Sequence, residues 1–104
     1  MEEKYMCYTL EEIKEKTVPI AVSYGIQSLG IFGSYARNEA VDGSDIDICV
    51  EKGSLRNLLQ YFSFVDELEK KLGCHVDVVT TEIDDKKFLE QILKERVLLY
   101  ERQG

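Results

Sequence analysis

The stretch that most constrains the fold is residues 33–50, which read GSYARNEAVDGSDIDICV. It begins with a Gly-Ser pair and ends in an apolar run that carries two aspartates in a D-x-D pattern. Alternation of apolar and polar residues predicts a strand at this end, and the run SLGIF at residues 28–32 predicts another strand before the Gly-Ser pair. Residues 37–43 between them predict a short polar helix and a turn, because Asp-Gly is a turn signal.

Asp45 and Asp47 lie on one face of the predicted strand, because side chains two residues apart in a strand point to the same side. Their backbones are about 7 Å apart by the rise of a strand. The apolar side chains of the same strand then point the other way, into a core: they are Ile46, Ile48 and Val50. The pattern therefore predicts one buried face and one face with paired carboxylates.

A second strand is predicted at residues 74–80, CHVDVVT, whose alternation puts His75 and Asp77 on the same face. If the two strands are neighbours, Asp77 lies beside Asp45 and Asp47. Carboxylates about 5 Å apart repel by roughly 3 kcal/mol per pair at an effective dielectric near 20, so the cluster needs a cation or a retained proton. Oxygen ligands suit Mg²⁺ or Mn²⁺ rather than zinc, and we expect His75 at the surface or outside the ligand set.

The Gly-Ser pair predicts a phosphate-binding turn. Gly33 lacks a Cβ, so a phosphate can approach its backbone closely. Ser34 supplies a hydroxyl at the start of the predicted short helix, where backbone N–H groups attract anions, although it also fits a helix cap. Arg37 falls on the same side one turn later and has the forked donors that suit a phosphate. Because Mg²⁺ prefers few carboxylates together with substrate phosphates, we expect a nucleotide as its companion.

A family resemblance rests on these motifs. The Gly-Ser pair, ten residues and then the D-x-D pattern resemble the G-S-x10-D-x-D signature of the minimal nucleotidyltransferases, within the DNA polymerase β-like nucleotidyltransferase superfamily. The later run HVDVVT resembles the family's strand with the third carboxylate. Asn38 stands where the family often has Gly, and Asn tolerates a left-handed backbone. The resemblance covers nearly the whole chain.

The resemblance implies a metal-dependent transfer of a nucleoside monophosphate, AMP from ATP, to a hydroxyl group, with loss of pyrophosphate. It implies two Mg²⁺ ions, with Mn²⁺ as an alternative. The residues that match the family's site are three catalytic and metal-binding carboxylates, Asp45, Asp47 and Asp77, and three nucleotide-binding residues, Gly33, Ser34 and Arg37.

The acceptor that the resemblance implies is a protein. Minimal nucleotidyltransferases are commonly paired with a HEPN ribonuclease toxin, which they adenylylate on a tyrosine as a type VII-like antitoxin. A chain of 104 residues is expected to form a single domain, 1–104, too small to enclose a substrate, so a bound partner would complete the site. Two alternatives remain: transfer to a small molecule such as an aminoglycoside, and a binding-only antitoxin without catalysis.

Charge, cysteine content and hydropathy limit the partners and the cell compartment that we expect. The net charge of −7 argues against long nucleic acids as direct partners, because phosphate binding needs a basic surface. The cysteines are odd in number, Cys7, Cys49 and Cys74, and lack CxxC spacing, so we expect reduced thiols in the cytoplasm. No apolar run reaches the roughly 18 residues that predict a membrane span.

The remaining segments predict helices around the strands. Thr9 begins a capping box, and Pro19 is expected to interrupt the helix that follows, as the first residue of a second helix. Ser54 is expected to cap a long helix that Gly73 ends, and Asp84 and Asp85 to begin a third. The long helix has a predicted core stripe: Leu55, Leu58, Leu59, Phe62, Val65, Leu68 and Leu72.

The predicted fold class is therefore α/β (α+β), of the nucleotidyltransferase type. We expect a small mixed sheet of about four strands, closed by a strand at residues 97–100. Helices should pack on one face of the sheet, and the carboxylate face should be only partly covered.

Overall fold

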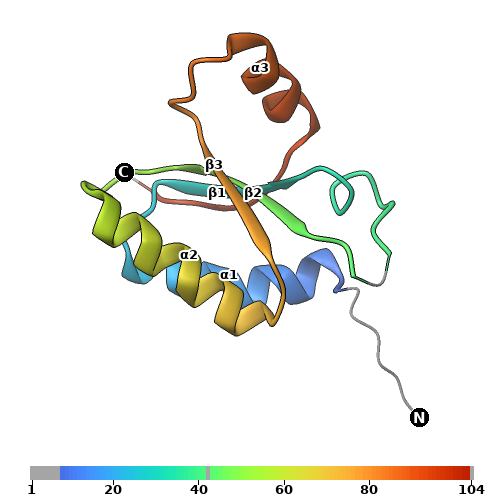
Figure 1. The fold of residues 1–104 in the computed structure, drawn as a ribbon, viewed down its shortest axis with the longest axis horizontal. Coiled ribbons are helices and arrows are strands. Elements are labelled where there is room, and N and C mark those ends of the chain that lie inside the picture. Colours follow the sequence, from blue (N-terminus) through green and yellow to red (C-terminus); the bar gives the residue numbers. More distant parts are fainter. Residues whose placement is uncertain (1–7, 42, 104) are drawn as a thin grey trace.

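The computed structural model describes residues 8–41 and 43–103. Two predictions fall on residues outside these ranges: the reduced thiol of Cys7 and the Asp-Gly turn that begins at Asp42. The described residues form three helices and four strands, shown in Figure 1. In chain order these are α1 (Leu10–Ser23), β1 (Ser28–Phe32), β2 (Ile46–Glu51), α2 (Leu58–Leu72), β3 (Val76–Thr80), α3 (Lys86–Glu95) and β4 (Val97–Glu101).

The four strands form one mixed sheet in the order β3-β2-β1-β4. β1 pairs antiparallel with both β2 and β4, whereas β2 and β3 run parallel. β2 and β3 are joined through α2, as a parallel pair requires. β3 and β4 are therefore the edge strands, and the predicted mixed sheet and closing strand are confirmed.

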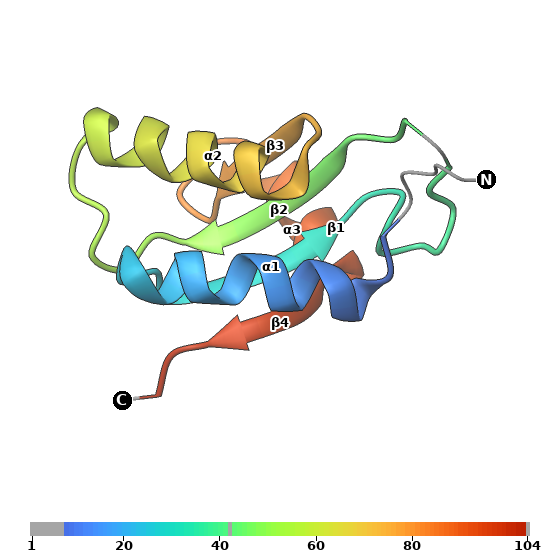
Figure 2. The same cartoon turned by 90° about the horizontal axis from the view of Figure 1, so that it is seen from below.

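The core lies between the sheet and two helices, α1 and α2, which run side by side beneath it (Figure 2). Ile46, Ile48 and Val50 of β2 have no exposed surface, as their alternation predicted. Phe64 of α2 packs against them as part of the same cluster, and its ring lies 5.4 Å from that of Tyr24 between ring centres. The predicted fold class is confirmed.

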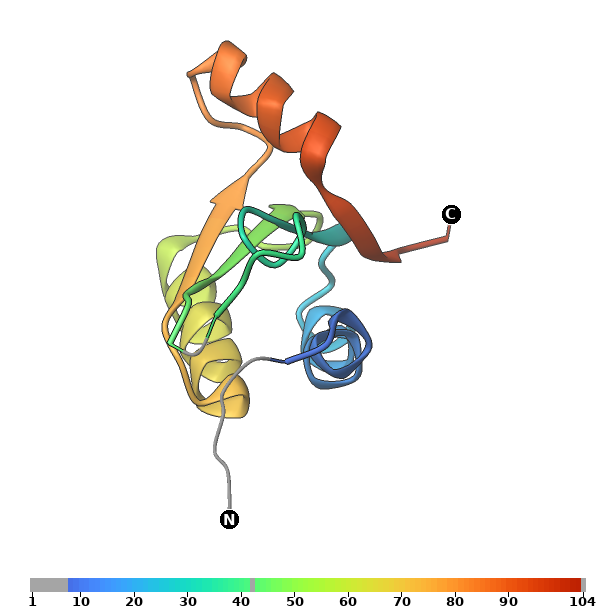
Figure 3. The ribbon, with the colours of Figure 1, turned by 90° about the vertical axis from the view of Figure 1, so that its right-hand side faces the viewer.

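The opposite face of the sheet is covered only in part. α3 stands over this face, away from α1 and α2 (Figures 1 and 3). Its residue Ile92 is buried against Phe32 of β1 and Cys49 of β2, and Val79 and Ile83 pack around them. This small second cluster anchors α3, so the last turn of α3 reaches the end of the sheet where Asp47 and Asp77 lie.

The predicted interruption at Pro19 is wrong, because α1 is a single helix from Leu10 to Ser23 with Pro19 inside it. Proline removes one backbone hydrogen bond and crowds the preceding turn. The helix persists because Ile13, Thr17 and Ala21 are fully buried along its inner side. Packing of a helix face stabilises a helix more than its intrinsic propensity does. The capping box at Thr9 is present as predicted.

The predicted short helix after the Gly-Ser pair is also wrong. Residues 33–38 form turns, closed by hydrogen bonds from Arg37 N–H to the Gly33 carbonyl (3.0 Å) and from Glu39 N–H to the Ser34 carbonyl (2.8 Å). Asn38 has φ +61°, a left-handed conformation that ends a helical turn before a second one forms. Asparagine tolerates this conformation, which is why it can stand at a position where glycine is common.

The predicted beginning and core stripe of the long helix need correction. α2 begins at Leu58, and the side chain of Asn57, not Ser54, caps it by accepting from Gln60 N–H. Leu58, Leu59 and Phe62 are 69%, 81% and 59% exposed, so the first turns of the predicted stripe do not face the core. Leu55, Leu68 and Leu72 of the predicted stripe are buried as expected. Phe64, which the stripe did not include, is buried on the same side of the helix as Leu68 and Leu72.

Two further local signals are confirmed. Asp85 caps α3 by accepting from Phe88 N–H at 3.1 Å, so it serves the helix and not the carboxylate site. Gly73 ends α2 in the left-handed conformation, with Lys70 and Lys71 in the last turn. Cys74 is half-buried at the rim of the core. Within the described ranges, no helix is long and apolar enough to cross a membrane.

Candidate active site

The structure places Asp47 directly opposite Asp77 across the parallel pair β2–β3. Asp45 immediately precedes β2. Oxygens of Asp45 and Asp77 and a ring nitrogen of His75 lie within 4.8 Å of one another. All three predicted carboxylates thus gather at the N-terminal ends of two adjacent strands, on the face away from the core.

The surroundings of Asp47 raise its affinity for a proton. The pKa of Asp47 rises to about 6, chiefly because the group is partly buried, and then because of the negative charge of Asp77 and a hydrogen bond with it. Asp45 adds to the increase, while Arg37 acts in the opposite direction. The free chain therefore carries negative charge at this point that its own cations do not balance.

His75 lies beside the carboxylates, as its position in the strand suggested. Its Nε2 is 3.0 Å from an oxygen of Asp77, and its Nδ1 is 3.1 Å from an oxygen of Glu69. The hydrogen bond with Asp77 raises the pKa of His75. The ring is 59% exposed and is held between two carboxylates, so it orients the Asp77 side chain.

Gly33 touches the carboxylate cluster. Its φ is +75°, and a Cβ at this position would overlap Oδ2 of Asp47. Only glycine therefore lets the turn lie against the carboxylate without strain. The neighbouring Ser34 hydroxyl makes no hydrogen bond within the described part of the chain, so it does not cap a helix.

Arg37 is held by two carboxylates. Its Nε lies 2.9 Å from Glu39, and its Nη1 lies 2.8 Å from Oε2 of Glu95, in the last turn of α3. The other oxygen of Glu95 accepts the Gly33 N–H at 2.9 Å. Glu95 was not predicted as a site residue, because it lies 62 residues from Gly33 and nothing in its local pattern marks it.

A cavity of about 600 Å³ opens between the Gly33 turn and α3. Gly33, Arg37 and Asp47 line one side of it, and Phe88 and Glu95 line the other. The cavity thus joins two of the three residues predicted to bind phosphate to one of the three carboxylates. The donor set of this region is rich in carboxylate oxygens, which fits a hard divalent cation such as Mg²⁺.

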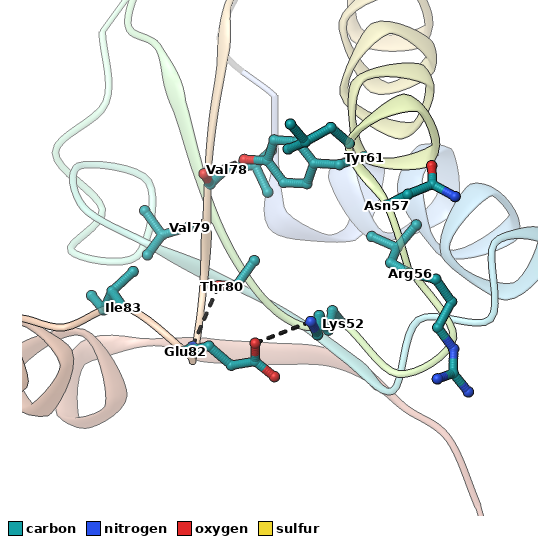
Figure 4. Close-up of a pocket in the computed structure, with 11 residues that line it drawn as sticks. Lys52, Arg56, Asn57, Tyr61, Val78, Val79, Thr80, Glu82 and Ile83 are labelled. Carbon is teal, nitrogen blue, oxygen red and sulfur yellow. Dashed lines mark hydrogen bonds and ion pairs between the residues drawn. The ribbon is translucent and has the colours of Figure 1, made fainter.

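A second cavity, of about 460 Å³, lies at the other end of the parallel strands and contains none of the six predicted site residues. Figure 4 shows Tyr61 reaching across it, with its hydroxyl donating to the Val78 carbonyl at 2.9 Å. An ion pair between Lys52 and Glu82, 3.1 Å apart, lies at its edge. Glu82 is the one acid among the described residues that line it, so this cavity offers no comparable metal chemistry.

Residues 15–104 match the family model described as Polymerase beta, Nucleotidyltransferase. Because the match covers most of the chain, the chain belongs to this nucleotidyltransferase family. The superfamily and the enzyme class predicted from the sequence are therefore confirmed.

Two archaeal relatives match over most of their length. MJ0435 of Methanocaldococcus jannaschii, provisionally named a protein adenylyltransferase, is 44% identical over 89 residues, which cover 86% of this chain and 90% of that protein. The protein adenylyltransferase MntA of Thermococcus cleftensis is 33% identical over 93 residues, which cover 86% of this chain and 94% of MntA.

Two solved structures share the fold. One, provisionally described as a minimal nucleotidyltransferase, is 32% identical with a TM-score of 0.75, covering 86% of this chain and 91% of that one. The other is a complex of a tri-AMPylated HEPN toxin of Shewanella oneidensis with its MNT antitoxin. It is 20% identical with a TM-score of 0.69, covering 89% of this chain and 73% of that one, and its likeness concerns the fold alone.

Proposed function

We propose that this chain transfers AMP from ATP to a hydroxyl group of a partner protein, in a reaction that depends on Mg²⁺. The observation that carries the proposal is the pairing of Asp47 with Asp77 in register, against the Gly33 turn. Carboxylates and a phosphate-binding turn at one point are what an α-phosphate displacement requires. The two archaeal relatives named as protein adenylyltransferases support the choice of AMP and of a protein acceptor.

Each predicted residue has a separate role in this proposal. Asp45, Asp47 and Asp77 bind two Mg²⁺ ions, which when bound neutralise the phosphates and lower the pKa of the attacking hydroxyl. Gly33 N–H, the Ser34 hydroxyl and the Arg37 guanidinium hold the β- and γ-phosphates. These contacts orient the triphosphate so that its α-phosphorus faces the acceptor.

The transfer itself is a single displacement. The acceptor oxygen forms a bond to the α-phosphorus, the bond from that phosphorus to the bridging oxygen breaks, and pyrophosphate leaves. Asp77 accepts the hydroxyl proton. Its side chain is 53% exposed on the edge strand β3, so a group carried by another protein can reach it.

The acceptor we propose is a tyrosine of a cognate HEPN ribonuclease toxin, with this chain as its antitoxin. The complex of an AMPylated HEPN toxin with an antitoxin of the same fold supports this choice. An exposed carboxylate on an edge strand also suits a protein acceptor better than a small molecule, which would need an enclosing pocket.

The test is transfer of label from α-³²P-ATP with Mg²⁺ to a purified HEPN toxin. We expect a labelled toxin with wild-type protein and none with Asp77→Asn, a near-isosteric change that leaves the fold intact. Asp84→Asn is the matched control, because Asp84 is an exposed carboxylate away from the cluster. A toxin that is neutralised without being labelled would indicate a binding-only antitoxin. A labelled small molecule in a lysate would indicate transfer to a small-molecule acceptor.

A further inference from the structure

Glu95 lies where the nucleotide phosphates are expected. Its two oxygens accept from the Gly33 N–H (2.9 Å) and from Arg37 (2.8 Å), which are two of the three groups assigned to phosphate binding. A carboxylate and a phosphate use the same donors, a backbone N–H and a forked guanidinium. The Glu95 carboxylate therefore imitates a phosphate within the chain's own anion site.

The position of Glu95 is not one that its own helix favours. It is the last residue of α3, and a negative side chain at a helix C-terminus is destabilising because of the helix dipole. Asp47, another acid, lines the same cavity. The contacts with Arg37 and Gly33 compensate for the unfavourable helix dipole and the nearby acid. They also lower the pKa of Glu95, so its carboxylate is charged in this position.

We propose that Glu95 is a built-in competitor of the triphosphate, which must release Gly33 and Arg37 before a nucleotide binds. The inference rests on the proposed function and adds a regulatory contact to the same site. The Glu95 side chain is 29% exposed, so a change of rotamer takes it to solvent while Ile92 keeps α3 on the sheet. A phosphate and α3 thus compete for one set of donors.

Nucleotide binds only those molecules in which Glu95 has released Gly33 and Arg37. The apparent affinity is therefore the intrinsic affinity multiplied by the fraction of such molecules. One charged hydrogen bond and one partly exposed ion pair must break. We expect about a tenfold effect, which is about 1.4 kcal/mol. A partner protein that moves α3 would remove this effect and so activate the site.

The test is calorimetric affinity for two probes, Mg–AMP-PNP and Mg–tripolyphosphate, in wild-type protein and in Glu95→Gln. The substitution keeps the size of the side chain and removes its charge. We expect both probes to bind about tenfold more tightly, while the melting temperature without ligand falls. Glu90→Gln is the matched control, because Glu90 is exposed on the same helix and its loss changes the net charge equally. Glu95→Asp, which is too short to make both contacts, is a second variant.

The outcomes separate the inference from the proposed function. Tighter binding of the probes to both Glu95 variants, with no change in Glu90→Gln, supports the role of Glu95 as a competitor. Binding to the Glu95 variants when wild-type protein shows none supports it as well. Equal or weaker binding in the Glu95 variants, with wild-type protein binding normally, overturns it and indicates that Glu95 positions Arg37 for the phosphate. No binding of either probe to any variant at millimolar concentration overturns the proposed function, and the inference with it.

Discussion

The two faces of β2 and β3 differ in what they contribute. On one face, Ile46, Ile48 and Val50 are fully buried under α1 and α2 and stabilise the fold. On the other, Asp47 and Asp77 meet at the same register, and partial burial, followed by the negative charge of Asp77, raises the pKa of Asp47. The same two strands thus carry the main source of stability on one face and a cluster of like charges on the other.

This difference shows how a small chain supports an acidic site. Burial of apolar side chains contributes about 25 cal/mol per Å², and many side chains share the core face, whereas the repulsion involves only a few carboxylates that water partly screens. Strand alternation keeps the two groups on opposite sides of one backbone. Substitutions on the core face should therefore change stability most, and substitutions of the carboxylates themselves should change function at little cost to stability.

The largest effect is expected for Ile48→Ala on the core face. Ile48 has no exposed surface, so the substitution removes buried methylene groups and leaves a cavity. We expect the free energy of unfolding to fall by about 2–5 kcal/mol, measured by urea denaturation. Ile48→Val is the control and should cost about 0.5–1.5 kcal/mol. A cost below that of Ile48→Val would mean that this face is not the main source of stability.

The next largest effect is expected for Gly33→Ala, at the edge of the carboxylate face. Alanine is strained at φ +75°, and its Cβ would also displace the Asp47 carboxylate. We expect a loss of about 2–3 kcal/mol and a loss of Mg–ATP binding. Gly73→Ala is the matched control, because Gly73 has φ +71° but open space where its Cβ would lie, and it should cost only about 1 kcal/mol. Equal costs would show that the contact with Asp47 is unimportant.

Asp47→Asn should have a smaller effect, with the opposite sign. The pKa of Asp47 is raised from 3.8 to about 6, so the folded state binds a proton more tightly than the unfolded state. Its contribution to stability is therefore full below about pH 4 and is lost as the pH rises through about 6. Because the group is partly solvated, we expect Asp47→Asn to raise stability by about 1 kcal/mol at pH 8 in EDTA.

The measurement for Asp47→Asn is urea denaturation from pH 4 to pH 8 in EDTA. Wild-type protein should lose stability relative to the variant over this interval. Asp84→Asn, on an exposed carboxylate, should follow the wild-type curve. A variant that is less stable than wild type at pH 8 would mean that the Asp47 charge is compensated in the free chain.

The smallest effect on stability is expected for Ser34→Ala. The Ser34 hydroxyl makes no hydrogen bond within residues 8–41 and 43–103, so its removal should change the free energy of unfolding by less than about 0.5 kcal/mol. The KM for ATP should rise, and Ser34→Asp should raise it further by placing a negative charge against the triphosphate. If Ser34→Asp binds Mg–ATP as well as wild type, the Gly-Ser turn does not hold the phosphates.

The features that the sequence alone predicted depend on short spacings. The D-x-D alternation, the capping box at Thr9 and the left-handed Gly73 each rest on contacts between residues two to four positions apart. Such contacts form wherever the segment folds locally. The pairing of Asp77 with Asp47 needed one further assumption, that the two strands are neighbours, and alternation then placed both carboxylates on the same face.

Other features depended on contacts that no local pattern contains. Burial along α1 keeps Pro19 inside a continuous helix, and the side of α2 that meets the sheet leaves Leu58 and Leu59 exposed. Glu95 reaches Gly33 only because Ile92 anchors α3 on the carboxylate face. The sequence by itself determined which residues share a strand face or begin a helix. The tertiary structure decided which helix face is buried and which acid meets the Gly-Ser turn, because these follow from packing between segments far apart in the chain.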